Sequence, residues 1–358
     1  MSRLLINLSI LLAQPTGISI YAKNIVPYLK SLNPTLLTAQ DFREFKSYAV
    51  PDNLTPAQGT KGHFDRFLWT QFQLPKIYKE LDSQLLFSPQ PEAPLFSKCR
   101  SVVMVHDFIP LRFPKRFSPL IPYHRYYIPQ VVAQAQHVIC NSQATADDII
   151  NFCHVPASKI TPIPLAHDAN HFRDLGEGAV RPYYYLYIGR HDPHKNLHRL
   201  IAAFSALPGN DDCELWLAGP QDKRYTPILQ AQVEELGITA RVKFLNYVPY
   251  SKLPSIINGA IALVFPSLWE GFGFPVLEAM ACGTPVITSN LSSLPEVTGD
   301  AAILINPYHP EEITEAMQLM RTDCQLRDRL STQGLTRANQ FSWERTGLAT
   351  CEILSRYL

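Results

Sequence analysis

The chain has 358 residues, of which 46% are hydrophobic, and its 32 basic side chains nearly balance 31 acidic ones. This length exceeds the usual domain size of about 100–200 residues, so we expect two domains that each bury a core. The near-neutral charge argues against nucleic acid as a partner, and no run approaches the roughly 20 apolar residues that a membrane span needs.

The N-terminal half contains short apolar runs that are typical of buried strands. They cover residues 4–10, 85–87, 102–105, 138–141 and 160–163. The first run is interrupted by Asn7 and Ser9, which favours a strand over the apolar core of a signal peptide. Gly17 follows this strand, before a helix expected from about Ser19, and permits close backbone approach to a phosphate or an acceptor. The dinucleotide fingerprint G-x-G-x-x-G is missing there.

Aromatic and basic side chains gather in the N-terminal half. Residues 1–150 hold 15 basic and 10 acidic side chains, and the stretch from 98 to 125 has Asp107 as its only acid. Its basic residues are Lys98, Arg100, Arg112, Lys115, Arg116 and Arg125. They suit an anionic membrane or a phosphorylated acceptor, and the alternative is a solvated rim. We expect acceptor-binding loops at residues 65–79 and 112–127.

The C-terminal half alternates strand and helix patterns more regularly. Strands are expected at residues 183–188, 214–218, 242–245, 260–265, 285–288 and 302–305. This rhythm indicates an α/β fold of doubly wound parallel sheets, whose ligands bind beyond the carboxyl ends of the strands. We place the linker at residues 171–181 and the domains at 1–172 and 173–340, with a final helix in 341–358.

The motif IGRHDPHKN, residues 188–196, follows the first strand of the second domain. Arg190 and Lys195 therefore project from a strand-to-helix loop, where two cations can neutralise a diphosphate. Asn196 is placed to cap the next helix. The nearby histidines 191, 194 and 198 lack the spacing of a metal site, and we expect no bound metal.

The motif EGFGFPVLEAMACGTPVI, residues 270–287, follows another apolar run. Glycines break the strand pattern, and Pro275 suits the first helical position, so a helix would carry Glu278 in its first turn. Glu270 lies in the loop before it. Two carboxylates at separate places along one ligand can accept hydrogen bonds from sugar and ribose hydroxyls. The plainer alternative is a carboxylate that complements the helix dipole beside an ordinary glycine turn.

This Glu270-x7-Glu278 pattern in its glycine and proline context resembles the retaining glycosyltransferases of family four, which have the GT-B fold of two Rossmann-like domains. The resemblance implies that Glu270, Gly271, Phe272 and Gly273 meet the donor sugar and that Glu278 binds ribose. It assigns the donor phosphates to Arg190, Lys195 and Gly17. It places the base at Gly219 and Val248, for which a plain turn is the alternative. It also implies that the last helix packs back on the acceptor-side first domain.

A His-Asp pair after the strand at residues 102–105 is similar to one in that family. By resemblance, His106 meets the donor sugar near the reacting carbon and Asp107 orients the imidazole, so both are catalytic candidates beside Glu270. A lone histidine at such a place is otherwise more often structural. The sequence HDFIPLRFP, residues 106–114, resembles bacterial mannosyltransferases of this group and favours GDP-mannose, while UDP-glucose stays open.

The resemblance implies a retaining hexosyltransferase that transfers a sugar from a nucleotide-diphosphate donor to a saccharide or lipid-linked acceptor. No D-x-D pair occurs in the sequence, so we expect neither a metal nor another cofactor. Seven cysteines without a C-x-x-C pair indicate a reducing compartment, hence a cytoplasmic protein. The basic patch leaves open a peripheral contact with the inner face of a membrane or binding of the acceptor. The alternatives are a non-catalytic nucleotide-sugar binding subunit, a phosphorylase and a sugar-nucleotide epimerase.

Overall fold

The computed structural model describes residues 3–11, 17–115, 118, 120–176, 183–209 and 212–358. The chain divides into two compact units. The N-terminal unit comprises Met1–Leu165 together with Trp343–Leu358, and the C-terminal unit comprises Ala166–Ser342. Of the linker expected at residues 171–181, the part up to residue 176 belongs to the C-terminal unit, and residues 177–181 lie outside the described chain.

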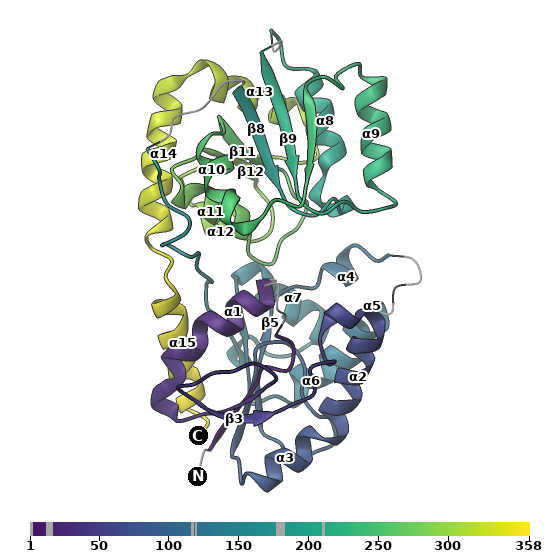
Figure 1. Cartoon of the computed structure of the whole chain (residues 1–358), viewed down its shortest axis with the longest axis vertical. Coiled ribbons are helices and arrows are strands. Elements are labelled where there is room, and N and C mark those ends of the chain that lie inside the picture. The colour runs from purple at the N-terminus through teal and green to yellow at the C-terminus, as the bar shows by residue number, and fades with distance from the viewer. Residues whose placement is uncertain (1–2, 12–16, 116–117, 119, 177–182, 210–211) are drawn as a thin grey trace. The chain divides into compact units, whose positions relative to one another are not determined.

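The N-terminal unit is built on one parallel sheet (Figure 1). In the described residues its strand order is β3-β2-β1-β4-β5-β6-β7. The strands are β1 (Leu4–Asn7), β2 (Thr35–Thr38), β3 (Lys46–Ala49), β4 (Leu85–Ser88), β5 (Ser101–Val105), β6 (His137–Cys140) and β7 (Ile160–Pro162). Most are buried at every position, as parallel strands covered on both faces should be. The order reverses direction between β1 and β4, which makes their carboxyl ends the expected ligand edge.

Helices of the N-terminal unit pack around this sheet. They are α1 (Gly17–Ile25), α2 (Gly59–Phe72), α3 (Leu74–Glu80), α4 (Ile109–Arg112), α5 (Leu120–Pro122), α6 (Ile128–Gln134), α7 (Gln143–Cys153) and α15 (Trp343–Ser355), with a π-helical turn at Tyr123–Tyr127. Residues 65–79, expected to form an acceptor loop, are therefore helical, in α2 and α3. The strands β2 and β3 were also missed, because β2 has only two apolar residues between its threonines and β3 is mostly exposed at the edge of the sheet.

The C-terminal unit contains a second parallel sheet, with the order β10-β9-β8-β11-β12-β13 in its described part. Its strands are β8 (Tyr183–Ile188), β9 (Cys213–Ala218), β10 (Val242–Asn246), β11 (Ala262–Phe265), β12 (Val286–Ser289) and β13 (Ile303–Ile305). Its helices are α8 (Leu197–Ser205), α9 (Thr226–Glu235), α10 (Leu253–Asn258), α11 (Phe274–Ala281), α12 (Leu294–Thr298), α13 (Pro310–Thr322) and α14 (Cys324–Ala338). The direction of winding reverses between β8 and β11, so ligands are expected where these two strands end.

The last helix, α15, belongs to the N-terminal unit and lies beside α1 (Figure 1). Thr346 donates a hydrogen bond to the Pro164 carbonyl, and Tyr357 is hydrogen-bonded to His137 at 3.1 Å. The expectation that the final helix packs on the first domain is confirmed. None of the helices in the described ranges combines the length and hydropathy needed to cross a bilayer.

Gly347 in α15 allows a close approach of two helices. A Cβ there would lie 2.5 Å from the Cβ of Tyr28, well inside contact distance. We expect Gly347→Ala to destabilise the docking of α15 by about 1–3 kcal/mol, because overpacking outweighs the better helix propensity of alanine. Faster amide hydrogen exchange in α15 would report this loss. Leu348→Ala is the control, since Leu348 is 55% exposed, and equal exchange in both variants would contradict the packing argument.

Candidate active site

The loop after β8 carries Lys195 and is held firmly by its own residues. The Tyr187 hydroxyl donates a hydrogen bond to the Arg190 carbonyl at 3.0 Å. The Asn196 backbone is left-handed, with φ of 63°. Its side-chain amide nitrogen, Nδ2, donates to the carbonyls of Pro266 and Pro307 at 3.1 and 2.6 Å. Asn196 does precede α8, but its side chain ties three loops together instead of capping the helix as expected.

The loop after β11 carries Glu270 and is bound to the start of α12. The Glu270 backbone N–H donates to the Ser292 hydroxyl at 3.0 Å. The Ser293 hydroxyl donates to the carbonyls of Glu270 and Phe272, at 3.1 and 2.8 Å. Gly273 has φ of 110°, and a Cβ there would lie 2.8 Å from the Leu294 side chain. These contacts hold the carboxylate loop in one conformation.

Lys195 and Glu270 meet at the point where β8 and β11 end. The Lys195 ammonium lies 2.5 Å from a Glu270 carboxylate oxygen, and the two side chains are only 15% and 10% exposed. The ammonium also lies 5.2 Å from the centre of the Phe265 ring. A desolvated cation and carboxylate placed side by side can hold a phosphate with one group and accept sugar hydroxyl hydrogen bonds with the other.

The other residues assigned to this edge differ in what they can offer. Arg190 is largely exposed, and its guanidinium lies 3.4 Å from Asp192. The Phe272 ring is buried against Phe274 and Phe341, so only the backbone of Phe272 can face a ligand. Gly271 is buried within the same loop.

Glu278 lies in α11 of the C-terminal unit, where it is partly buried. The helix begins at Phe274, so Pro275 occupies the second position and Glu278 the fifth. The expectation that Glu278 lies in the first turn is therefore wrong, and the helix dipole alone does not explain it. Burial raises the pKa of Glu278 to about 8, which keeps this carboxyl largely protonated at neutral pH.

Two positions were assigned to the nucleotide base. Gly219 has φ of 142°, and a Cβ there would lie 2.0 Å from the Gly189 carbonyl oxygen. The glycine is thus required where the loops after β8 and β9 touch. Its N–H donates to the Asn246 carbonyl at 2.7 Å, and Val248 is half-buried in the loop that follows β10.

In the N-terminal unit, His106 follows β5 as expected. Its Nε2 lies 2.9 Å from the Pro89 carbonyl, which can only accept, so Nε2 carries the proton and Nδ1 keeps a lone pair. Burial lowers the pKa of His106 and favours the neutral ring. Asp107 accepts from the Ile109 N–H at 3.0 Å, and the hydrogen bond that orients His106 is the one it donates to the Pro89 carbonyl. Gly17 begins α1, while the preceding residues 12–16 lie outside the described chain.

Part of the expected basic patch has a structural explanation. Arg112 forms an ion pair with Asp148, whose side chain is fully buried, while Lys98, Arg100, Lys115 and Arg125 are exposed. Arg116 lies outside the described residues. Across the described ranges, no group of three or more His, Cys, Asp or Glu side chains is arranged to hold a metal ion.

Sequence reasoning missed the residues that support the carboxylate loop. Ser292 and Ser293 precede α12, where a serine ordinarily signals a helix cap. The Ser293 hydroxyl instead bonds carbonyls of the Glu270 loop, and it makes no cap hydrogen bond. A serine pair after a strand gives no sign of the loop it will contact, because that loop lies about 20 residues away.

Comparisons with known proteins agree with this fold. The family described as "Glycosyl transferases group 1" matches residues 173–337, and the one described as "Glycosyltransferase Family 4" matches residues 15–171. The O-antigen chain mannosyltransferase B of Escherichia coli is 31% identical over 257 residues, which cover 68% of this chain and 67% of that protein. The serotype-specific mannosyltransferase WbdA of Escherichia coli is 27% identical over 77% of this chain, which spans only 35% of WbdA.

Solved structures show the same architecture. Anabaena HepE in complex with UDP and glucose has a TM-score of 0.76 at 20% identity, covering 99% of this chain and 100% of HepE. WaaG, a glycosyltransferase involved in lipopolysaccharide biosynthesis, has a TM-score of 0.71 at 16% identity, covering 98% of this chain and 99% of WaaG. At these identities the likeness establishes the GT-B fold.

Proposed function

Because the chain belongs to the group 1 glycosyltransferases, we propose that it is a retaining hexosyltransferase that takes mannose from GDP-mannose to a hydroxyl of a saccharide or lipid-linked acceptor. The ion pair between Lys195 and Glu270 at the end of β8 and β11 is the observation that carries this proposal. It supplies a cation for the diphosphate and a carboxylate for the sugar at the edge where parallel sheets bind ligands.

Charge neutralisation at the donor diphosphate falls to side chains in this proposal. Lys195 would turn from Glu270 to the phosphates when the donor binds, and the exposed Arg190 would turn from Asp192 towards the same group. Two cations can offset the charge that develops on the departing nucleoside diphosphate. We therefore propose a metal-independent transfer, with Glu278 on the ribose and Gly17, Gly219 and Val248 as further donor contacts.

Retention would follow from a reaction on one face of the sugar. The bond between the anomeric carbon and the phosphate oxygen breaks, and the acceptor oxygen bonds to the same face. The acceptor proton passes to the departing phosphate, so Glu270 positions the sugar and does not attack it. The neutral His106, with its lone pair on Nδ1, would accept a hydrogen bond from a donor-sugar hydroxyl.

Mannose as the transferred sugar is supported by the names of two relatives, the O-antigen chain mannosyltransferases B of Escherichia coli and RfbU of Salmonella typhimurium. UDP-glucose is the competing donor, because HepE was solved with UDP-glucose. Work at the inner face of a membrane is part of the same proposal. The exposed cations Lys98, Arg100, Lys115 and Arg125 support contact with anionic lipid.

Thermal unfolding with GDP, UDP, ADP and their sugar conjugates in EDTA tests the donor assignment. A nucleotide at about 100 times its dissociation constant should stabilise the protein by roughly 2.7 kcal/mol. We expect GDP and GDP-mannose to shift the unfolding temperature while UDP and ADP do not. A shift with UDP alone would overturn the mannose assignment, and a shift seen only with added Mg²⁺ would overturn metal independence.

Transfer itself is tested by incubating GDP-mannose with a mannoside acceptor and reading the anomeric configuration of the product by NMR. An α-linked product from the α-configured donor is the expected result. A β-linked product would contradict retention. Donor binding without any product across acceptors would favour a non-catalytic binding subunit, and a changed free sugar nucleotide would indicate an epimerase.

A further inference from the structure

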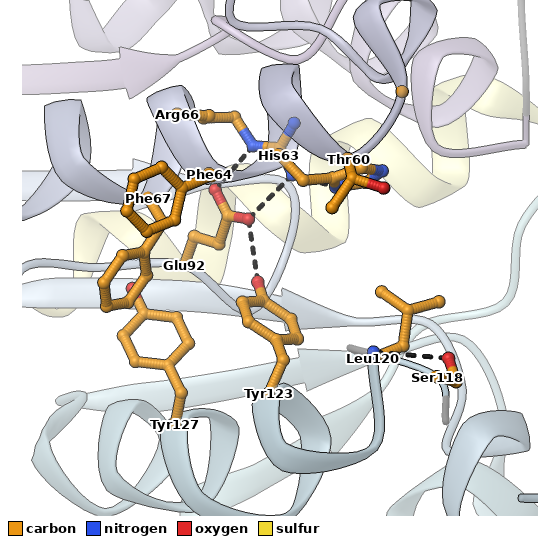
Figure 2. A pocket seen from close by; sticks show the side chains of 11 residues that line it. Thr60, His63, Phe64, Arg66, Phe67, Glu92, Ser118, Leu120, Tyr123 and Tyr127 are labelled. Carbon is orange, nitrogen blue, oxygen red and sulfur yellow. Dashed lines mark hydrogen bonds and ion pairs between the residues drawn. The ribbon is translucent and has the colours of Figure 1, made fainter. Parts of the chain in front are cut away.

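A hollow of about 540 Å³ opens in the N-terminal unit, lined by α2, the segment after β4 and the turn at Tyr123–Tyr127 (Figure 2). We propose that this hollow binds the hydrocarbon chain of a lipid-linked acceptor. The inference rests on the proposed function, because it names which of the two acceptor classes the enzyme takes. Three observations support it: the polar groups of the floor are saturated, the walls are mainly apolar, and the hollow lies near His106.

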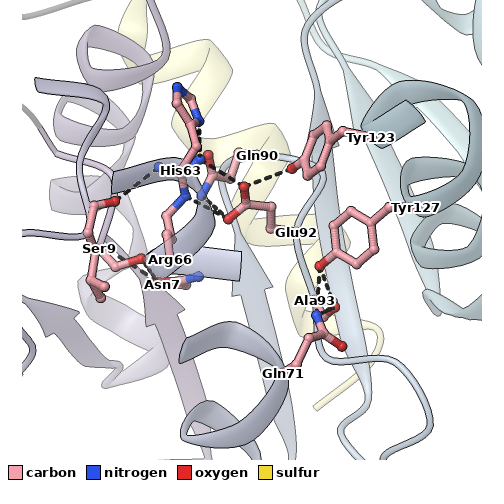
Figure 3. A network of polar contacts seen from close by, with 11 residues as sticks. Asn7, Ser9, His63, Arg66, Gln71, Gln90, Glu92, Ala93, Tyr123 and Tyr127 are labelled. Atoms are coloured by element: carbon pink, nitrogen blue, oxygen red, sulfur yellow. Dashed lines mark hydrogen bonds and ion pairs between the residues drawn. The ribbon is translucent and has the colours of Figure 1, made fainter. Parts of the chain in front are cut away.

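The floor of the hollow is a carboxylate whose hydrogen bonds are already complete. Glu92 is 2% exposed. It accepts from Arg66 Nε and Nη2 at 2.8 and 2.9 Å, from Gln90 at 2.8 Å and from the Tyr123 hydroxyl at 2.7 Å (Figure 3). Two carboxylate oxygens offer about four acceptor sites, and all four are filled. Glu92 therefore has no capacity left for a ligand hydroxyl.

The other polar groups around Glu92 are occupied as well. Arg66 also donates to the Leu54 carbonyl at 3.0 Å and to Nδ1 of His63 at 3.1 Å. The Tyr127 hydroxyl donates to the Ala93 carbonyl at 2.8 Å. Burial and the neighbouring carboxylate raise the pKa of Tyr123, so its hydroxyl stays protonated and keeps donating to Glu92.

A polar ligand would gain little from Glu92 and its partners, although Thr60, His63 and Ser118 also line the hollow. A sugar that lost its water here would leave hydroxyls without partners, whereas a hydrocarbon chain has none to satisfy. The walls present ring faces and an aliphatic side chain. The ring centres of Phe67 and Tyr127 lie 5.0 Å apart in an edge-to-face contact, and those of Tyr123 and Tyr127 lie 5.1 Å apart. Phe64 and Leu120 are 59% and 39% exposed.

The hollow also adjoins the segment that holds the proposed catalytic histidine. Pro89, whose carbonyl fixes His106, and Glu92 both belong to the short stretch that follows β4. β4 and β5 are neighbouring strands, so their carboxyl ends share one edge of the sheet. A chain seated against Glu92 would leave its head group at the edge that carries His106, where the acceptor hydroxyl is needed.

A competing explanation is adsorption of α2 to a bilayer. Phe64, Leu68 and Phe72 recur at every fourth position of α2 and are 59%, 38% and 62% exposed. Phe64 lines the hollow and Phe72 does not, although the two residues match in type, helix and exposure. Substituting each of them in turn therefore distinguishes binding in the hollow from adsorption of the exposed face of α2.

The test titrates the full-length protein with farnesyl phosphate below its aggregation concentration, using isothermal calorimetry. We expect binding by the native protein, a loss of about tenfold or more in affinity for Phe64→Asp, and affinity within about twofold for Phe72→Asp, since only the first places a carboxylate beside the chain. Inorganic phosphate and methyl α-mannoside should not bind at this site. Both substituted side chains are exposed, and unchanged unfolding temperatures would verify that the variants fold.

Equal weakening by the two variants would overturn the pocket in favour of surface adsorption. Binding of methyl α-mannoside that Phe64→Asp abolishes would overturn the hydrocarbon assignment in favour of a sugar subsite, and no binding of farnesyl phosphate would also overturn it. The proposed function is judged separately by GDP binding in the C-terminal unit, which Phe64→Asp should leave unchanged. Binding of farnesyl phosphate without binding of any nucleotide would overturn the proposed transferase function and would still support the hollow as a lipid site.

Discussion

Lys195→Ala is expected to lower kcat for sugar transfer by about 10²–10³-fold, the usual loss when one preorganised group that stabilises developing charge is removed. Lys195 is the less exposed of the two cations at the end of β8 and β11, so its charge is weakly screened. Because the leaving diphosphate gains negative charge as the sugar bond breaks, the loss should fall on kcat more than on KM. Single-turnover measurements with GDP-mannose check this split.

Lys243→Ala is the matched control for this variant. Lys243 also pairs with a carboxylate, Glu214, at 2.8 Å in the C-terminal unit, but its side chain is 46% exposed and lies outside the site. Its removal should leave kcat unchanged. Arg190→Ala should fall between the two, since Arg190 is 67% exposed in the free protein. Equal kcat values for Lys195→Ala and Lys243→Ala would contradict the phosphate role of Lys195.

Loss of Lys195 also leaves Glu270 buried without its partner. Breaking a buried pair by removing one member costs roughly 3–5 kcal/mol, so reduced activity could reflect unfolding. Glu270→Gln in the Lys195→Ala background removes the stranded charge and should recover much of the stability. Recovery of the unfolding temperature with kcat still well below that of Glu270→Gln alone would assign the lost activity to the chemical role of Lys195.

Strand positions were predictable where a buried strand reads as a continuous apolar run, whereas β2, which is buried but has threonine at both ends, was missed. Residues 102–105 and 260–265 read as continuous apolar runs because a buried parallel strand has no solvent side. β3 gave no such signal, since its residues Lys46–Ala49 are mostly exposed at the sheet edge. The helix α2 was missed because its arginine and aromatic positions face a hollow, which blurs the division into buried and solvent faces.

The site was predictable as a set of residue types on particular loops, but its internal partners were not. Lys195 and Glu270 are 75 residues apart along the chain, and only the strand order makes them neighbours. The sequence analysis assigned Lys195 to the phosphates and Glu270 to the sugar, but it did not reveal that the two form an ion pair in the free protein. The four hydrogen bonds that saturate Glu92 likewise join segments that no local pattern connects.

Glu278 should make the stability of the free protein fall as pH rises from about 4.5 to about 8. Burial raises its pKa from 4.5 to about 8, so within this window the folded state holds a proton that the unfolded state has released. The effect is complete above pH 8 and is on the order of a few kcal/mol. Glu278→Gln should remove this pH dependence of the free energy of unfolding, and it should be more stable than the native protein at pH 8. Chemical denaturation at several pH values measures both curves.

The same carboxyl should make nucleotide binding depend on pH, in the opposite sense. Ribose hydroxyls donate hydrogen bonds, and an ionised carboxylate accepts them best, so binding below pH 8 must expel the Glu278 proton. Affinity for GDP should therefore rise between pH 6 and 8, by up to about tenfold per unit, and then level off. Calorimetry in buffers of different ionisation enthalpy counts the released proton. Glu278→Gln should bind GDP more weakly and without that proton release. Titration of the nucleotide phosphates contributes equally to the native protein and the variant, so it cancels when the two are compared. Proton release that persists in Glu278→Gln would place the titrating group elsewhere and remove the ribose from Glu278.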